Sequence, residues 1–313
     1  MSRPVAASLF AGVGGSSLGY KQAGFEVAYA NEFEPEIAAA YELAHGIEVD
    51  GRSVTDVRGG NILDAVGGHL DVLDGSPPCQ GYSTMKMGHD GEQAAERRSF
   101  YLDFVRLVGE CRPRAFCSEN VAGFASGAHR GKYFIPIIAA LRGGGYRVAA
   151  RTLDASRLGV PQKRRRVILI GFRDDLGIDP AAAFPVRQSP MAMGDAEGLA
   201  HVARIVKEPK SQGGILARPF RQRKTYTAQL PSPTLCAKGM DAAHFSYIEV
   251  ETRDGEQRPP SIGELKALAG FPADFPLPEG TTLELAWKML GNCVPPPMAR
   301  AWAEGVRDAL HGA

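Results

Sequence analysis

The sequence predicts an α/β fold, and three observations support this class. Short apolar runs alternate along the chain with segments of helical spacing. The first apolar run leads into a glycine-rich turn and then into a helix, which is the opening unit of a nucleotide-binding fold. Polar residues suited to chemistry directly follow several of the runs. In open α/β sheets, ligands bind in the crevice beyond the carboxyl ends of the strands.

The glycine turn follows a predicted strand at 6–10 and precedes a helix from about Leu18 to Ala23. Because glycine has no side chain, the backbone at positions 12, 14 and 15 can approach a ligand closely. Tight strand-to-helix turns are often glycine-rich for structural reasons alone, so the motif does not identify a ligand by itself. Two acidic residues at later strand ends add to the pattern. Glu32 follows the strand 27–30, where it can accept hydrogen bonds from ribose hydroxyls, and Asp56 lies in a third short segment, 53–57.

Cys79 follows a buried apolar strand at 70–74 and two successive prolines, which fix φ and stiffen the backbone that presents the thiol. A free cysteine is more often a buried structural thiol. The flanking Pro-Pro and Gln-Gly pairs would pack poorly in a core, so they favour a nucleophile on a rigid loop. The following stretch, 84–99, lacks clean periodicity and is predicted to be a mobile active-site loop.

A predicted helix at 100–111 and strand at 115–118 bring Glu119 to the same sheet edge as Cys79. Taken alone, Glu119 is more typical of an acid at a helix N-terminus than of a catalyst. A helix at 135–141 and a strand at 146–153 come next. The basic run 163–166 is then held between a proline turn and the apolar strand 167–172, and fixed guanidinium groups suit phosphate or a base edge.

From about 174 to 226 the periodicity is poor, which indicates a second, smaller region. A strand is predicted at 246–250 and a helix at 261–268, with Ser261 as N-cap and Glu264 completing a capping box. The final helix is predicted at 298–310.

Composition describes an ordinary soluble protein of 313 residues, 44% hydrophobic and 23% charged. There is no apolar run long enough for a transmembrane helix and no signal-peptide pattern, and the five cysteines show no CxxC spacing. We therefore expect a cytoplasmic protein without a metal site. The net charge is only +1, but residues 1–75 carry eleven Asp/Glu against four Lys/Arg, while 201–224 carry seven Lys/Arg against one Glu. An acidic part facing a small cofactor and a basic part facing a polyanion would produce this pattern, and so would chance.

Taken together, the ordered motifs resemble those of the DNA cytosine-5 methyltransferase family over essentially the whole chain. The matching blocks, in order, are Phe10-Ala11-Gly12-Val13-Gly14-Gly15, Asn31-Glu32, Asp56-Val57, Pro77-Pro78-Cys79-Gln80, Glu119-Asn120-Val121, Gln162-x-Arg164-x-Arg166 and Gly291-Asn292-x-Val294-Pro295. Any one block is a weak signal, but seven in order are not a chance result.

The resemblance implies a seven-stranded, mostly parallel sheet of the S-adenosylmethionine-dependent methyltransferase type with a small inserted target-recognition domain. We expect residues 1–180 and 286–313 to form the catalytic domain and 181–285 to form the recognition domain and hinge. The implied cofactor is S-adenosylmethionine, with S-adenosylhomocysteine as its product. Its methionine end would lie by the glycine turn and its ribose on Glu32. The full set of implied cofactor contacts is Phe10, Gly12, Gly14, Gly15, Glu32, Phe33, Asp56, Val57, Phe100, Asn292 and Val294.

The resemblance also implies the chemistry. Attack of the Cys79 thiolate on C6 of a flipped-out cytosine makes C5 nucleophilic, and Glu119 contacts N3 and the exocyclic amine. Arg166, together with Arg164, would hold the cytosine O2 and a neighbouring phosphate. The implied partner is double-stranded DNA, bound by a monomer. The expected DNA contacts are Gln80, Ser83, Lys86, Gln162, Arg165, Arg218, Arg221, Arg223 and Lys224.

Three alternative functions compete with this interpretation of the sequence. A tRNA cytosine-5 methyltransferase could share this scaffold, although the residues typical of the RNA-acting relatives are not found upstream of the last motifs. A catalytically silent DNA-binding relative is disfavoured because Cys79, Glu119 and Arg166 are all present. A Rossmann oxidoreductase is disfavoured by the glycine spacing. Whether the enzyme has a cognate restriction endonuclease or is solitary stays open, as does the DNA sequence it recognises.

Overall fold

The computed structural model describes residues 3–78, 92–207, 224–237 and 248–312, and for 92–99 it describes the backbone alone. The chain divides into two compact units. Unit 1 comprises Met1–Leu153, Arg165–Val186 and Ala299–Ala313. Unit 2 comprises Asp154–Arg164 and Arg187–Met298. In the described part of the chain, no helix is both long and apolar enough to cross a membrane.

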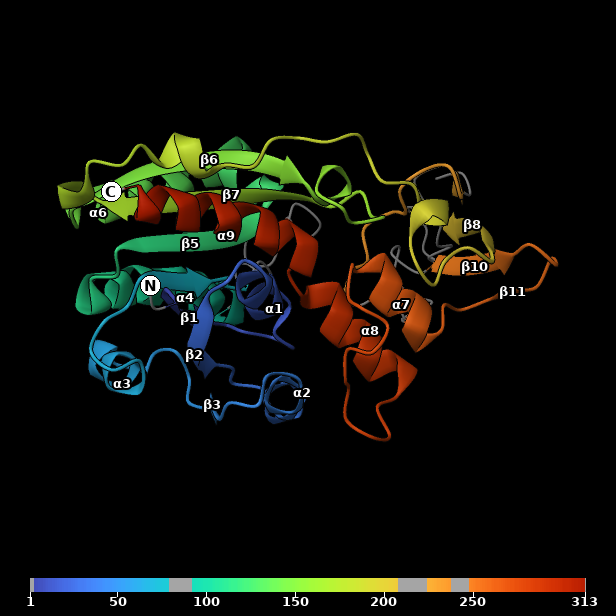
Figure 1. Cartoon of the computed structure of the whole chain (residues 1–313), viewed down its shortest axis with the longest axis horizontal. Coiled ribbons are helices and arrows are strands. Elements are labelled where there is room, and N and C mark those ends of the chain that lie inside the picture. Colours follow the sequence, from blue (N-terminus) through green and yellow to red (C-terminus); the bar gives the residue numbers. More distant parts are fainter. Residues whose placement is uncertain (1–2, 79–91, 208–223, 238–247, 313) are drawn as a thin grey trace. The chain divides into compact units, whose positions relative to one another are not determined.

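Unit 1 is built on a mixed sheet with the strand order β3-β2-β1-β4-β5-β7-β6 (Figure 1). Its strands are β1 (Val5–Leu9), β2 (Glu26–Asn31), β3 (Val49–Asp50), β4 (Val72–Gly75), β5 (Ala115–Val121), β6 (Tyr146–Asp154) and β7 (Arg165–Arg173). The pairs β3–β2, β2–β1, β1–β4 and β4–β5 are parallel, whereas β7 runs antiparallel to β5. The α/β class predicted from the sequence is therefore confirmed.

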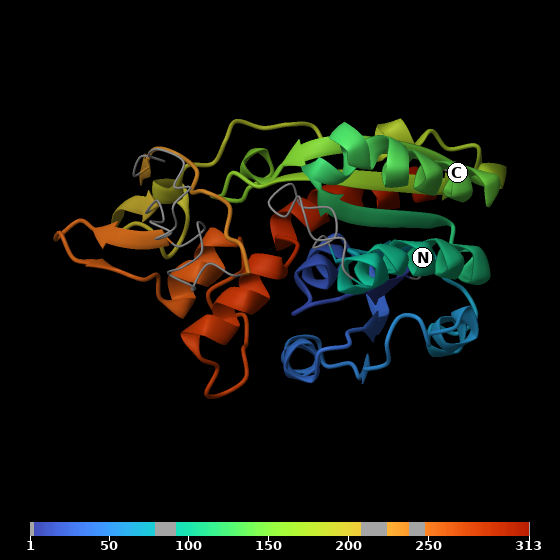
Figure 2. The ribbon, with the colours of Figure 1, turned by 180° about the vertical axis from the view of Figure 1, so that it is seen from behind.

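Helices cover both faces of this sheet. They are α1 (Gly15–Gln22), α2 (Pro35–His45), α3 (Gly59–Ala65), α4 (Glu92–Cys111), α5 (Gly127–His129), α6 (Ile135–Gly143) and α9 (Pro296–His311). Figures 1 and 2 show α1 and α9 over one face and α4 and α6 over the other. The indole N–H of Trp302 on α9 donates a 3.3 Å hydrogen bond to the Tyr20 hydroxyl on α1, which ties the first of these helix pairs together.

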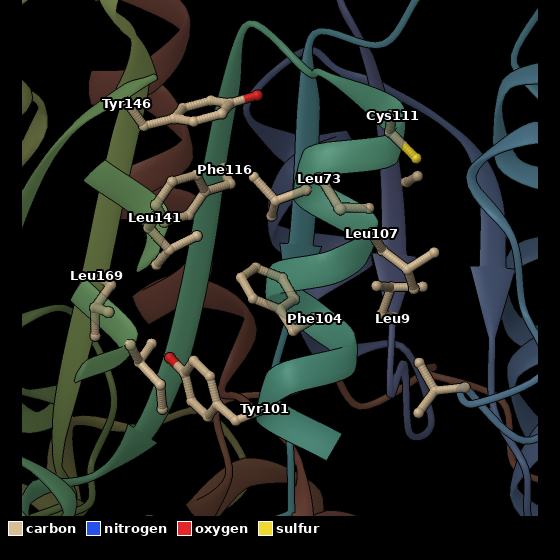
Figure 3. Close-up of a cluster of buried hydrophobic side chains, with 14 of the residues drawn as sticks. Leu9, Leu73, Tyr101, Phe104, Leu107, Cys111, Phe116, Leu141, Tyr146 and Leu169 are labelled. Atoms are coloured by element: carbon tan, nitrogen blue, oxygen red, sulfur yellow. The ribbon is translucent and has the colours of Figure 1, made fainter. Parts of the chain in front are cut away.

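The largest described core lies between the sheet and α4 (Figure 3). Phe104 and Leu107 of α4 are fully buried, as are Leu73 of β4 and Phe116 of β5. Both strands are buried on both faces, as expected for strands covered by helices on either side, and on the face toward α4 they present these apolar side chains. Burying each such side chain contributes about 1.5–3 kcal/mol. This packing fixes the strand ends that carry the candidate site.

Two local expectations for unit 1 were wrong. The segment 53–57 is a turn, closed by a 2.8 Å hydrogen bond from the Asp56 N–H to the Ser53 carbonyl, and the strand is the preceding β3. Its Ser, Thr and Asp residues favour turns over strands. Residues 92–99 belong to α4 rather than to a loop, whereas 84–91 lie outside the described residues. Glu119 lies near the end of β5, so the strand carries it to the sheet edge as predicted, and the alternative of an acid at a helix N-terminus does not apply. The helices α2 and α3 were not assigned from the sequence.

Unit 2 contains a four-stranded antiparallel sheet in the order β11-β10-β8-β9. Its strands are β8 (Val202–Lys207), β9 (Lys224–Thr227), β10 (Ile248–Thr252) and β11 (Gln257–Arg258), and its α-helices are α7 (Ile262–Leu268) and α8 (Leu283–Asn292). The strand predicted at 246–250 corresponds to β10. The strands β8 and β9 occur in the stretch whose sequence pattern indicated irregular structure.

The capping box at the start of α7 is confirmed. The Glu264 carboxylate accepts a 2.6 Å bond from the Ser261 N–H, and the Ser261 hydroxyl accepts a 3.2 Å bond from the Glu264 N–H. The same carboxylate pairs with Arg258 at 2.8 Å and with His201 at 2.6 Å, while its side chain is only 2% exposed. Burial alone would raise the pKa of Glu264, but Arg258, Ser261 and His201 outweigh it and hold the pKa at about 2.

Glu264→Gln is expected to destabilise the protein by about 2 kcal/mol at pH 7, because Arg258 and the Ser261 N–H lose a charged hydrogen-bond acceptor. The folded pKa lies below the ordinary value of 4.5, so the carboxylate stabilises the fold above pH 4.5 and this contribution is lost as the pH falls toward 2. The difference between wild type and variant should therefore shrink in that interval. Urea denaturation at a series of pH values measures it. Glu279→Gln, at an exposed position, is the matched control. A constant difference between pH 7 and pH 3 would contradict this account.

Candidate active site

The parallel strands of unit 1 bring several predicted residues to one edge of the sheet. Glu32 follows β2, Pro77 and Pro78 follow β4, and Glu119 lies near the end of β5. Because β2, β1, β4 and β5 pair in parallel, their carboxyl ends meet at the same edge. This is the edge at which open α/β sheets bind ligands.

The approach to Cys79 is fastened to the end of β5. The side-chain amide of Asn120, which is fully buried, donates a 3.1 Å hydrogen bond to the carbonyl of Pro77. The fixed φ of the prolines then limits where the chain can go next. Sequence reasoning did not identify this role of Asn120, although its position directly after Glu119 was the available signal. Cys79 itself lies outside the described residues, together with Gln80, Ser83, Lys86, Arg218, Arg221 and Arg223.

Glu119 and Arg166 form an ion pair at this edge. Arg166 Nε lies 2.8 Å from Glu119 Oε1, and the two side chains are only 14% and 10% exposed. The strand register explains the pairing. Since β7 runs antiparallel to β5, its first residues lie beside the last residues of β5, with Val121 opposite Arg166 and Glu119 opposite Ile168. A carboxyl group and a guanidinium are thereby fixed together where parallel strands end.

The glycine turn lies in the left-handed region of the backbone, with φ of 54° at Phe10, 57° at Gly12 and 87° at Gly14. A Cβ at Gly14 would lie 1.9 Å from His45 Nε2, so this glycine is needed for packing within the protein. At Gly12, by contrast, a Cβ would meet nothing within 4 Å. His45 therefore packs against the turn at Gly14, whereas the space beside Gly12 is open.

Glu32 holds this turn in place. One carboxylate oxygen accepts a 2.9 Å bond from the Gly12 N–H, and the other accepts a 3.0 Å bond from the Glu34 N–H. Burial raises the pKa of Glu32, and the backbone N–H groups partly oppose that shift. The neighbouring Phe33 is 66% exposed, which is unusual for so large an apolar side chain.

These features fit the cofactor that the sequence implies. A carboxylate at the end of β2 suits ribose hydroxyls, an exposed aromatic ring suits stacking on adenine, and the open face of Gly12 admits a ligand. Phe10 and Phe100 lie with ring centroids 6.2 Å apart and add apolar surface beside the turn. The prediction for Asp56 and Val57 needs adjustment. The Val57 side chain is fully buried in the core, so only its backbone and the exposed Asp56 could reach a ligand. Among the described residues, no group of three or more His, Cys, Asp or Glu could hold a metal ion.

In unit 2, two predicted substrate or DNA contacts have other partners. Arg164 is 3% exposed and donates to the carbonyls of Gly291 at 3.0 Å and Leu235 at 3.4 Å. Gln162 is 1% exposed, donates to the Leu268 carbonyl at 3.0 Å and accepts from the Leu235 N–H at 3.2 Å. Both side chains therefore satisfy buried backbone groups. This favours a role in holding unit 2 together over direct contact with the substrate.

The exposure of the other predicted site residues in the described chain differs from one to the next. Lys224 on β9 and Arg165 at the start of β7 are exposed, as DNA contacts require. Asn292, at the end of α8, is exposed, and Val294 is buried. Gly291 is needed for packing, because a Cβ there would lie 2.8 Å from the Ala237 nitrogen.

Comparison with known proteins is consistent with these observations. The sequence model of the C-5 cytosine-specific DNA methylase family matches residues 6–307. The Type II methyltransferase M.XorII of Xanthomonas oryzae pv. oryzae is 35% identical over 79% of this chain. The matching region covers 57% of the length of M.XorII. The Type II methyltransferase M.MthTI of Methanothermobacter thermautotrophicus is 28% identical over 98% of both chains.

A solved structure agrees in fold. A candidate DNA modification methyltransferase encoded within an E. coli prophage superposes with a TM-score of 0.72, covering 98% of this chain and 99% of the other, at 20% identity.

Glu32→Gln is expected to weaken binding of S-adenosylhomocysteine by at least about tenfold, because one of two backbone N–H groups loses its carboxylate acceptor and the turn shifts. Isothermal titration calorimetry measures the change. Glu36→Gln, on the exposed side of α2, is the matched control and should bind like wild type. Equal affinities of the two variants would show that Glu32 does not shape the cofactor site.

Proposed function

The chain belongs to the C-5 cytosine-specific DNA methylase family, and we propose that it acts as a DNA cytosine-5 methyltransferase through a covalent adduct between Cys79 and the target base. One observation carries the assignment of the site. The ion pair of Glu119 and Arg166 lies at the end of β5, and Asn120 anchors Pro77, two residues before Cys79, to that same strand end.

Each of these residues has a chemical task in the proposal. The Cys79 thiolate attacks C6 of cytosine and forms an S–C6 bond, while the electron pair of the C5–C6 double bond shifts to C5 and, through C4, toward N3. Glu119 gives a proton to N3 and accepts a hydrogen bond from the exocyclic amine, which stabilises the charge that develops there. C5 then accepts the methyl group. A base removes the C5 proton, the C5–C6 double bond forms again as the S–C6 bond breaks, and N3 returns its proton to Glu119.

Arg166 acts both on Glu119 and on the base. Its Nε faces the Glu119 carboxylate at 2.8 Å, which fixes the carboxyl group in one orientation. Its Nη1 donates to the Arg165 carbonyl at 2.9 Å, and the other guanidinium N–H groups are suited to the cytosine O2 and a neighbouring phosphate. Arg164 is proposed to hold the backbone of residues 235 and 291 within unit 2 rather than to touch the base.

The cofactor in the proposal is S-adenosylmethionine, which supplies an electrophilic sulfonium methyl group when bound. The residues that would hold it in unit 1 are the glycine turn with Phe10 and Gly12, the Glu32 carboxylate, the exposed ring of Phe33 and Phe100. Asn292 and Val294 complete the expected set from the last motif.

Double-stranded DNA is the proposed substrate, and the family match and the Type II relatives favour it over tRNA. A cytosine must leave the duplex to reach a thiol at a strand end, at a cost of a few kcal/mol. Residues 181–285, which include the basic stretch 201–224, are assigned to target recognition, and 1–180 with 286–313 to catalysis. The enzyme works as a monomer, and a cognate restriction endonuclease is compatible with this proposal.

The proposal predicts that Cys79→Ala lowers methyl transfer to duplex DNA by at least about 1000-fold, because the covalent route is lost. Transfer of labelled methyl groups from S-adenosylmethionine to duplex DNA and to tRNA, assayed in parallel, measures both the activity and its substrate. Cys236→Ala, which removes a half-buried thiol elsewhere, should retain wild-type activity. Methylation of tRNA but not of DNA would contradict the proposed substrate. Full activity of Cys79→Ala would contradict the mechanism.

A further inference from the structure

Asp74 is a buried carboxylic acid on the strand that leads to the nucleophile loop. It is the third residue of β4 and is only 3% exposed. In the sheet it lies opposite Ser8 of β1 and Cys117 of β5. Paired residues of neighbouring strands point to the same face, as do residues two apart in one strand. Asp74, Cys117 and Glu119 therefore share one face of the sheet.

The carboxyl group of Asp74 is bonded to the first turn of α1. The Ser16 hydroxyl donates a 2.6 Å hydrogen bond to Asp74 Oδ2, and the Tyr20 hydroxyl, one turn further along α1, also bonds the carboxyl group. Tyr20 in turn accepts the bond from Trp302 of α9. This buried chain of polar groups connects three elements of unit 1. Through it, the glycine turn that precedes α1 is fastened to the strand that precedes Cys79.

The position of Asp74 is also electrostatically unusual. The first turn of a helix exposes N–H groups and carries a partial positive charge, which attracts anions. The Asp74 carboxyl group contacts this first helical turn from inside the protein. The glycine turn leads into the same end of the helix, and there Gly12 borders open space, where a ligand could bind. Two carboxylates approaching one helix end repel each other, and the pair is most stable when one of them holds a proton.

The groups that face Asp74 are Ser16 and Tyr20 of α1, Tyr41 of α2, and Cys117 and Glu119 of β5. Burial raises the pKa of Asp74 to about 7, the bonds from Ser16 and Tyr20 oppose this shift, and the nearby Glu119 adds to it. In the folded protein the acid is thus protonated below pH 7 and ionised above it. The carboxyl group can therefore lose or take up a proton near neutral pH.

We propose that Asp74 is a positioning residue that couples cofactor binding to proton uptake. It holds α1 against β4, and it takes a proton from solvent when the carboxylate of the cofactor's methionine end arrives at the glycine turn. This inference rests on the proposed function, because it takes the methionine end to bind at that turn. No bond other than O–H is made or broken in the step.

The coupling has a measurable consequence. Above pH 7 the free protein carries an ionised Asp74, so binding takes up a proton and becomes weaker as the pH rises. Below pH 7 the acid is already protonated, and the pH dependence disappears. A loss of affinity of up to about tenfold per pH unit is expected above the midpoint, which is the limit for uptake of one proton.

Calorimetric titration of S-adenosylhomocysteine at pH 7.5 in phosphate and in Tris tests the proposal, because the two buffers release different heats for each proton transferred. The wild-type protein should take up about half a proton or more. Asp74→Asn, which keeps the size of the side chain but cannot titrate, should bind without this uptake. Asp64→Asn, at an exposed position on α3, is the matched control and should behave as wild type.

Ser16→Ala provides an independent arm if Asp74→Asn does not fold. It removes the 2.6 Å bond to Asp74 but leaves the acid in place, so the pH at which affinity begins to fall should move upward. An unchanged pH profile in Ser16→Ala, the same proton uptake in Asp74→Asn as in wild type, or proton release on binding would each overturn the proposal. Failure of the wild-type protein to bind S-adenosylhomocysteine at all would instead contradict the proposed function.

Discussion

The reversal of chain direction between β5 and β7 is the constraint on which the candidate site depends. Parallel strands deliver their carboxyl ends to one edge, so a carboxylate at the end of β5 would have only other strand ends as neighbours. The antiparallel β7 begins at this edge and brings Arg166 within 2.8 Å of Glu119. Both side chains are largely buried, and removing two charges from water is costly unless they are paired in good geometry. The sheet register provides that geometry before any substrate arrives.

The same edge depends on two polar contacts made by residues without a role in the chemistry. Asn120 fixes the carbonyl of Pro77, and Glu32 fixes the N–H of Gly12. The first contact fixes Pro77, two residues before Cys79, and the second limits the shape of the glycine turn. Asp74 joins these two regions from beneath, through Ser16 and α1. Positioning in this site therefore comes from buried polar groups, of which Asn120 and Asp74 lie one layer behind the residues that would touch the ligands.

The sequence was sufficient for features set by local patterns. The apolar strands of unit 1, the capping box of α7 and the acid at the end of β2 each follow from a few neighbouring residues. It was not sufficient where the outcome depends on distant partners. Arg164 and Gln162 were predicted to contact the substrate or DNA. In the structure both side chains are buried and donate hydrogen bonds to backbone carbonyls far along the chain, such as those of Leu268 and Gly291. The strands β8 and β9 are not predicted from the sequence, because each is stabilised by pairing with a strand that is distant along the chain. The role of Asp74 becomes visible only once β4 and α1 are packed together.

The central claim is that a thiol at this edge becomes bonded to C6 of cytosine. Duplex DNA containing 5-fluorocytosine tests it most directly, because after methylation the fluorine at C5 cannot leave as a proton does and the S–C6 bond persists. The account predicts a DNA–protein adduct that survives denaturation, forms only with S-adenosylmethionine present and maps by mass spectrometry to the peptide containing Cys79. Methylated 5-fluorocytosine DNA without any adduct, or an adduct on another cysteine, would contradict it.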